Sequence, residues 1–397
     1  MSQIQAASQG PCPEVANELT RELGGFDCSG SPVVEFRNPA DLTHWTMPLL
    51  EVLILAGAVL ALWYAVRRLR RHGDPTNLAL MIGGLAYLTI NEPPLYFPNK
   101  FGLMEQVGLN FVHNVFTVQF MWDRLPLYIS ALYIALPMLA YEAVRVTGVF
   151  RRYGLLPGAL AVGFVHSAFY EIFDTIGPQL SWWKWNHDAP SNSVFLDAVP
   201  VGSITLYSAV SIAGLALGLG LFVGRQTWAG NAPRGRSLVW RTAAVGATAL
   251  VVMLAVGALE SVVRGLGGGD GAYAVVLYLE LAIVWVGGAL ALGASWLAGR
   301  REGTAVSSVY SRVYGWSFLA AFAFFWAVSI PSRLDAVDGV TPQGTELGNL
   351  PFVLLCFAAA TFVTLVAGHG GPLEDEDAQD TGERGSRVDP VGSATQA

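Results

Sequence analysis

The chain has 397 residues, of which 53% are hydrophobic and only 13% are charged, with a mean hydropathy of +0.45. A soluble domain carries about twice that charged fraction, so the composition excludes an ordinary soluble protein. The net charge of −7 owes much to an acidic C-terminal stretch, and no basic patch with interleaved aromatic residues suggests nucleic-acid binding. We therefore predict an all-α, polytopic integral membrane protein without a nucleic-acid partner.

Residues 1–45 are polar and lack the basic start and short apolar core of a signal peptide. We predict an extracytoplasmic segment here. Outside the cell, Cys12 and Cys28 would close a disulfide loop of about 15 residues, and two free thiols are the alternative. No second Cys or His pair has ligand spacing, so we predict neither a metal site nor a cofactor.

Apolar runs of roughly the 20 residues that cross a bilayer recur along the chain. They predict nine transmembrane helices, at residues 47–66, 77–97, 125–145, 155–177, 199–223, 242–263, 272–298, 315–331 and 350–368. Most arginines lie in loops after the odd-numbered helices, which places those loops in the cytoplasm and the N-terminus outside. Residues 46–368 then form a bundle in the cell membrane, and residues 369–397 a disordered, acidic cytoplasmic tail.

Carboxyl groups within the predicted helices give the best indication of function. Ionisable groups inside a membrane are costly and usually mark a functional site in the bundle interior. Five of them fall in the outer half of the predicted bundle: Glu92, Glu171, Asp174, Glu260 and Glu280. We predict catalytic roles for Glu171, Asp174, Glu92 and Glu280, and an ion pair between Glu260 and Arg264.

The fourth predicted helix carries the most informative pair. Glu171 and Asp174 are three residues apart, and Ser167 lies four residues before Glu171, so all three share one side of the helix. Two carboxylates at this spacing in a low dielectric cannot both be charged cheaply, so one is expected to hold its proton and act as a general acid. The alternative is a helix end that dips into the outer water.

Glu92 lies in the run Asn91-Glu92-Pro93-Pro94 at the end of the second predicted helix. We expect the two prolines to break the helix and leave backbone carbonyls that need partners. Glu92 would then line a cavity at the break. A solvated glutamate at an interfacial helix end is the alternative.

Aromatic residues gather on the predicted outer side. The apolar segment 98–123, which contains His113, is expected to lie in the interface or to re-enter the membrane. Trp183 and Trp185 belong either to an interfacial aromatic belt or to a pocket wall that stabilises a carbocation. The candidate substrate-binding residues are His113, His166, Trp183, Trp185, Asn91 and Tyr170.

Short motifs in the middle of the chain resemble two families of membrane enzymes. Glu92-Pro93 ends one predicted helix, Glu171 lies on a later one, and an aromatic turn follows. This layout resembles the actinobacterial spirocyclases related to the avermectin spiroketal cyclase, although Ser167 stands where that family has an earlier acid. Asp174, the two tryptophans and Val199-Pro200 are similar to bacterioruberin-type carotenoid hydratases. Both resemblances imply acid chemistry on a lipophilic polyketide or isoprenoid of secondary metabolism.

We expect a cofactor-independent membrane enzyme, a cyclase (isomerase) or a hydratase (lyase), that protonates an alkene or enol ether of a lipophilic small molecule. Glu171 or Asp174 would be the acid, and Glu92 and Glu280 would stabilise the cation or act as base. Besides this substrate, membrane lipids are the expected partners. A proton-coupled transporter that uses the same carboxylates as a relay is one alternative, and a structural assembly protein is another.

Overall fold

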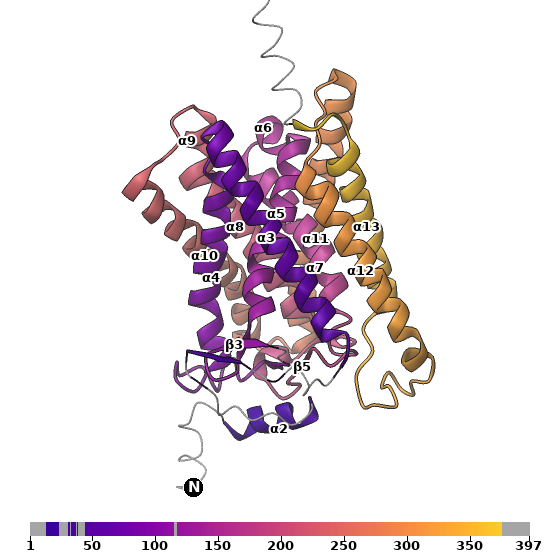
Figure 1. Ribbon diagram of the computed structural model, residues 1–397. Coiled ribbons are helices and arrows are strands. Elements are labelled where there is room, and N and C mark those ends of the chain that lie inside the picture. The colour runs from indigo at the N-terminus through magenta and orange to yellow at the C-terminus, as the bar shows by residue number, and fades with distance from the viewer. Residues whose placement is uncertain are drawn as a thin grey trace, which may run out of the picture.

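The protein forms one bundle of long helices, capped at one end by short strands, in a computed structural model (Figure 1). The structure describes residues 13–23, 31, 33–36, 38, 44–114 and 117–374. Within these residues, eight helices are long and apolar enough to cross a membrane: α3 (Met47–His72), α5 (Leu127–Thr147), α7 (Leu155–Asp174), Ser203–Trp228, α10 (Gly235–Gly265), α11 (Asp270–Glu302), α12 (Val309–Leu334) and α13 (Leu350–His369). The prediction of an all-α, multi-pass architecture is thus confirmed, with eight such helices where nine were predicted.

The predicted helix that is not among these eight is the second, 77–97, which corresponds to α4 (Thr76–Tyr96) and is 21 residues long. It runs beside α10 at close range, since a Cβ atom on Gly246 of α10 would lie 2.6 Å from the Gly83 carbonyl oxygen. The expected break at Pro93 and Pro94 is wrong. The helix continues through both prolines, and the Phe97 N–H donates to the Pro93 carbonyl at 2.9 Å.

The helix Ser203–Trp228 is not a regular α-helix. It consists of η2 (Ser203–Val210) and η3 (Gly220–Gly224), both π-helical, which alternate with α8 (Ser211–Leu219) and α9 (Arg225–Trp228). Widened turns of this kind occur frequently at functional sites. Here the first of them begins directly beside the last residue of α7.

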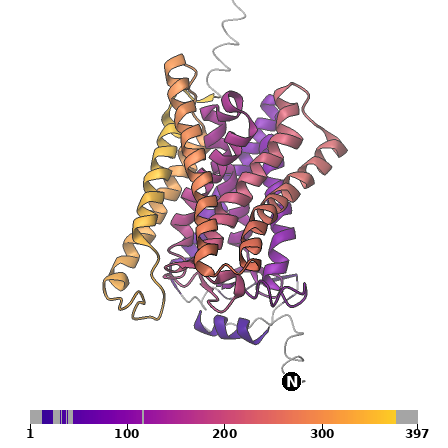
Figure 2. The same ribbon diagram turned by 180° about the vertical axis from the view of Figure 1, so that it is seen from behind.

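Short elements cover one end of the bundle, which we call the strand end. They are α2 (Glu14–Glu22), β1 (Val34–Phe36), β2 (Phe111–His113), β3 (Val118–Phe120), β4 (Leu125–Pro126), β5 (Trp183–Trp185), η1 (Pro190–Asn192), β6 (Phe195–Leu196) and β7 (Val199–Pro200). The strands pair as β1-β3-β4, β2-β5 and β6-β7, all antiparallel. The short helix α6 (Val149–Tyr153) lies at the opposite end, as both side views show (Figures 1 and 2).

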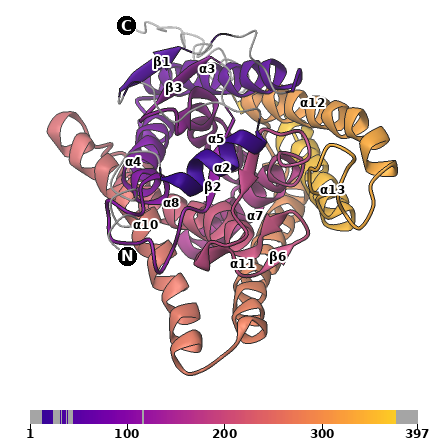
Figure 3. The same cartoon turned by 90° about the horizontal axis from the view of Figure 1, so that it is seen from below.

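Burial differs strongly between helices. The apolar windows of α5 and α7 are 78% and 72% buried, so these two helices form the centre of the bundle. In contrast, α10 and α11 are only 28% buried and project from the bundle as a hairpin (Figure 3). Their exposed side chains are apolar, including Val251, Leu254 and Ile283, as expected for helices that face lipid.

Candidate active site

A cavity of about 730 Å³ lies at the strand end, inside the bundle. This volume is within the roughly 300–1,000 Å³ typical of small-molecule sites. Helices α4, α5, α7, η2 and α10 form its walls, and strands β2 and β5 form its roof. Most of its lining is apolar, with residues such as Ile90, Leu95, Ile129, Leu132, Phe173, Leu206, Leu250 and Leu254. An apolar cavity of this kind suits a lipophilic ligand.

Three carboxyl groups from three helices line this apolar cavity: Asp174, Glu92 and Glu260. Asp174 is the last residue of α7 and is 1% exposed. Its Oδ2 atom accepts a hydrogen bond from the Ser203 hydroxyl at 3.2 Å. Ser203 is the first residue of η2, so the start of the π-helical stretch fixes one oxygen of this carboxyl group.

Glu92 lies across the cavity, in the last turn of α4, and is 5% exposed. Its Oε1 atom accepts a hydrogen bond from the Tyr133 hydroxyl of α5. Asn91 and Pro94 line the cavity on either side of it. The continuation of α4 through the prolines therefore places Glu92 inside the bundle, because the helix does not end at the interface.

Glu260 and Arg264 lie one turn apart on α10, at the rim of the cavity. We expected an ion pair between them, but the carboxylate within ion-pair distance of Arg264 is Asp270, at 3.8 Å. The Arg264 guanidinium stacks on the Tyr273 ring, with 3.9 Å between its central carbon and the ring centroid. The Oε1 atom of Glu260 and both carboxyl oxygens of Glu280 on α11 are buried without a hydrogen-bond partner among the described residues. Glu280 itself does not line the cavity.

Glu171 and His166 lie behind the cavity wall. Glu171 is 0% exposed, one turn before Asp174, and does not line the cavity. The His166 ring stacks on Tyr170 and its Nδ1 lies 2.7 Å from the Ser208 carbonyl oxygen. It lines a small adjoining pocket of about 40 Å³.

The structure divides the ten predicted site residues into two groups. Seven line the main cavity: Asp174, Glu92, Asn91, Tyr170, His113, Trp183 and Trp185. The other three, Glu171, Glu280 and His166, do not line it.

The roof of the cavity is the pairing of β2 with β5. Its register places His113 opposite Trp183 and Phe111 opposite Trp185. The ring centroids of Phe173 and Trp183 are 4.7 Å apart, so the roof packs on the end of α7. Burial lowers the pKa of His113 to about 3, which leaves its imidazole neutral at physiological pH. His113 is thus a weak base here. Its Nδ1 atom lies 3.3 Å from the Tyr128 hydroxyl.

Several lining residues were not predicted from the sequence. Tyr133 and Ser203 hold the two carboxyl groups, while Tyr207, Asn192 and Arg264 add polar atoms to the wall and rim. Tyr133 and Tyr207 gave a usable signal, because a tyrosine hydroxyl within an apolar helix needs a buried partner. Ser203 and Asn192 could not be predicted, because hydroxyl and amide side chains near helix ends are also typical of residues at the membrane interface.

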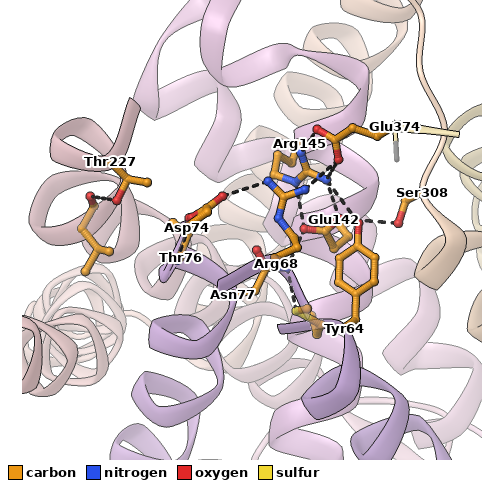
Figure 4. A network of polar contacts seen from close by, with 12 residues as sticks. Tyr64, Arg68, Asp74, Thr76, Asn77, Glu142, Arg145, Thr227, Ser308 and Glu374 are labelled. Atoms are coloured by element: carbon orange, nitrogen blue, oxygen red, sulfur yellow. Dashed lines mark hydrogen bonds and ion pairs between the residues drawn. The ribbon is translucent and has the colours of Figure 1, made fainter. Parts of the chain in front are cut away.

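The opposite end of the bundle is closed by a buried network of charges (Figure 4). Glu142 of α5 is 0% exposed and accepts two hydrogen bonds of 2.8 Å from Arg145. Glu374, within the predicted tail, accepts hydrogen bonds of 2.6–2.7 Å from Arg145 and Arg68. Burial opposes ionisation of Glu374, but the hydrogen bonds and positive charges of the two arginines lower its pKa to about 2. Arg68 also pairs with Asp74, at 2.8 Å.

Residues 370–374 lie against the bundle beside this network. The Ser307 and Leu373 backbones form a parallel bridge, and the Ser307 hydroxyl donates to the Gly371 carbonyl at 2.7 Å. Cys12, Cys28 and the rest of the predicted tail lie outside the described residues. The cavity and the charge network therefore occupy opposite ends of one bundle.

Comparison with known proteins found no matching family model, no similar curated sequence and no similar solved structure. The fold and the site define a multi-pass helical membrane protein with an acidic, largely apolar cavity near one end. The chemistry of this cavity therefore has to be argued from its own residues.

Proposed function

We propose that this chain is a membrane enzyme that uses carboxylic acids, without a cofactor, to cyclise or hydrate a lipophilic polyketide or isoprenoid. The observation that carries the proposal is the placement of Asp174 and Glu92, from two helices, in one cavity with largely apolar walls. A spirocyclase-like cyclase and a carotenoid-hydratase-like enzyme both fit this chemistry. Localisation in the cell membrane follows from the same proposal.

The reaction begins with transfer of a proton from Asp174 to one carbon of an alkene or enol ether. The second carbon becomes cationic, and the faces of Phe173, Trp183 and Trp185 in the roof and wall stabilise this charge. In a cyclase a hydroxyl of the same substrate attacks the cation, and in a hydratase a water molecule does so. Glu92, oriented by Tyr133, accepts the proton that the attacking oxygen loses.

In this mechanism Asp174 is the acid, and Glu171 acts through it. Both residues lie on α7, but only Asp174 lines the cavity. Glu171 is buried one turn away, so its charge or proton influences Asp174 rather than the substrate. Glu260 at the rim and the buried Glu280 of α11 are the remaining acids of the proposed site.

Comparative mass spectrometry of apolar extracts tests the proposal. The extracts come from cells carrying the wild type, a deletion, Asp174→Asn, or the Glu171→Gln, Asp174→Asn double variant. Loss of a positioned acid typically costs about 10²–10⁴-fold in rate, so both variants should accumulate the same substrate as the deletion. A product heavier by one water identifies a hydratase, and an isomer identifies a cyclase.

Thermal unfolding of the purified variants serves as the control, because the substitutions preserve side-chain volume. An active double variant that folds normally would contradict the mechanism. If all extracts match, transport driven by the same carboxylates becomes the better interpretation, and radiolabelled uptake assays would then be the next experiment.

A further inference from the structure

A second cavity, of about 800 Å³, lies on the other side of β5 at the strand end. The end of α2, the start of α3, the turn before β5, the end of α12 and the loop that follows α12 form its walls. Trp183 and Trp185 line both cavities, so strand β5 forms a wall that the two cavities share. The lining of this second cavity is much more polar than that of the first, with serine, threonine and glutamine side chains.

Gln179 supplies a fixed acceptor in the second cavity. The residue is 5% exposed, and its Nε2 donates to the Ser329 carbonyl at 3.0 Å and to the Ser332 hydroxyl at 3.1 Å. These two bonds fix the orientation of the amide. Its Oε1 atom is buried without a hydrogen-bond partner among the described residues. A buried acceptor of this kind calls for a water molecule or a ligand group that donates to it.

The shared wall supplies two donors. Trp183 is 2% exposed and Trp185 is 8% exposed, and the Nε1 atoms of both lack a hydrogen-bond partner within the described part of the chain. Each indole combines a flat apolar face with one N–H donor at its edge. Together with Gln179, this wall offers apolar surface, donors and an acceptor within one cavity.

Three of the charged residues that line the second cavity, Lys184, Glu22 and Glu346, are already paired. Lys184 forms an ion pair with Glu22, and Glu346 lies 2.8 Å from the imidazole of His187. Asp335 adds a further acidic group to the lining, so an anionic ligand would meet net negative charge. The Gln179 amide and the indole N–H groups are neutral, and together with the Asp335 carboxylate they favour an uncharged ligand that both donates and accepts hydrogen bonds.

We propose that the second cavity binds a neutral, polyhydroxylated ligand, namely a sugar ring or a glycosyl group. Each hydroxyl of a sugar donates one hydrogen bond and accepts others, which matches the Gln179 acceptor and the indole donors. The apolar face of the ring would lie on a tryptophan. This site shares Trp183 and Trp185 with the first cavity, but ligand binding in it does not require the acid chemistry proposed there.

Titration of the purified full chain with maltose, trehalose and N-acetylglucosamine tests the site. The protein is kept in a detergent without a sugar head group, because a maltoside would compete. Binding is followed by tryptophan fluorescence and calorimetry. We expect saturable binding of at least one saccharide, weakened about tenfold by Gln179→Met, since that variant loses a buried hydrogen bond at constant volume. Gln106→Met, at the first cavity, is the matched control and should bind as the wild type does.

Absence of saturable binding by all three saccharides would overturn the proposal. Binding of tetramethylammonium in their place would do the same, because it would identify a cation site. If Gln179→Met fails to fold, Ser332→Ala decides the question, and an affinity equal to that of the wild type would then count against the site. Asp174→Asn is expected to leave saccharide binding unchanged, which separates this test from that of the proposed function.

Discussion

Tyr133 is the side chain that orients Glu92 from the neighbouring helix. Its hydroxyl donates to the Glu92 Oε1 atom, and both residues line the first cavity. We expect Tyr133→Phe to lower the rate of product formation about tenfold, since one hydrogen bond to a charged group contributes roughly 1.5–3 kcal/mol and water can replace part of it. Product formation in membranes carrying the variant is the measurement. Tyr278→Phe, on the exposed side of α11, is the matched control and should be fully active.

At the residue scale, the sequence correctly predicted that the site is acidic, but it did not predict correctly which acidic residues line the cavity. Asp174 and Glu92 line the cavity as expected, whereas Glu171 does not. Residues three apart on a helix differ in direction by about 60°, because each residue turns the helix by about 100°. The cavity ends between these two directions, so the Asp174 side chain lines it and the Glu171 side chain does not. Sequence spacing shows that Glu171 and Asp174 are neighbours, but only the packing of η2 against α7 determines which one lines the cavity.

At the scale of elements, Gly177 makes the approach of β5 to the end of α7 possible. A Cβ atom at this position would lie 1.9 Å from the Trp183 ring. We therefore expect Gly177→Ala to displace Trp183 and to lower the free energy of unfolding by about 1–3 kcal/mol, as overpacked cores do. Thermal unfolding and tryptophan fluorescence measure the two effects. Gly293→Ala in α11, where nothing lies within 4 Å of the added methyl group, should leave the fluorescence unchanged and should not destabilise the protein, because alanine is the better helix former by up to about 1 kcal/mol.

The helices were predictable because each is a long apolar run, and their described bounds overlap all nine predicted ranges. The strands were not predicted. β2 and β5 are three residues each, too short for a clear alternation of apolar and polar residues. β2 and β5 are also about 70 residues apart in the chain, so their pairing depends on the fold that brings α4 and α7 together. The roof of the cavity therefore became visible only in the structure.

At the scale of the whole molecule, Glu374 connects three distant parts of the chain. It binds Arg68 of α3 and Arg145 of α5 from beyond the end of α13. We expect Glu374→Gln to lower the free energy of unfolding by about 1–2 kcal/mol at neutral pH, less than for a fully buried pair because Glu374 is partly exposed. The apparent unfolding temperature in detergent is the measurement. Glu302→Gln, in an exposed pair with Arg152, should have little effect.

The pH dependence of this variant gives a second check. The pKa of Glu374 is about 2 in the folded protein, below its ordinary value of 4.5. Between these two values the unfolded chain binds more protons than the folded protein, so the stabilisation is present above pH 4.5 and is lost as the pH falls toward 2. The difference in unfolding temperature between wild type and Glu374→Gln should therefore be constant near neutrality and shrink below pH 4.5. A difference independent of pH would show that the charge of Glu374 is not responsible.

The position of Glu374 in the chain also bears on biosynthesis. Its partners Arg68 and Arg145 precede it by 306 and 229 residues, and every helix of the bundle is synthesised before it. During insertion into the membrane, and before Glu374 is synthesised, the acidic partners of the two arginines among the described residues are Asp74 and Glu142. The end of the bundle opposite the strand end can form its contacts with Glu374 only after α13 has left the ribosome. We therefore expect assembly of that end to be a late step that follows membrane insertion.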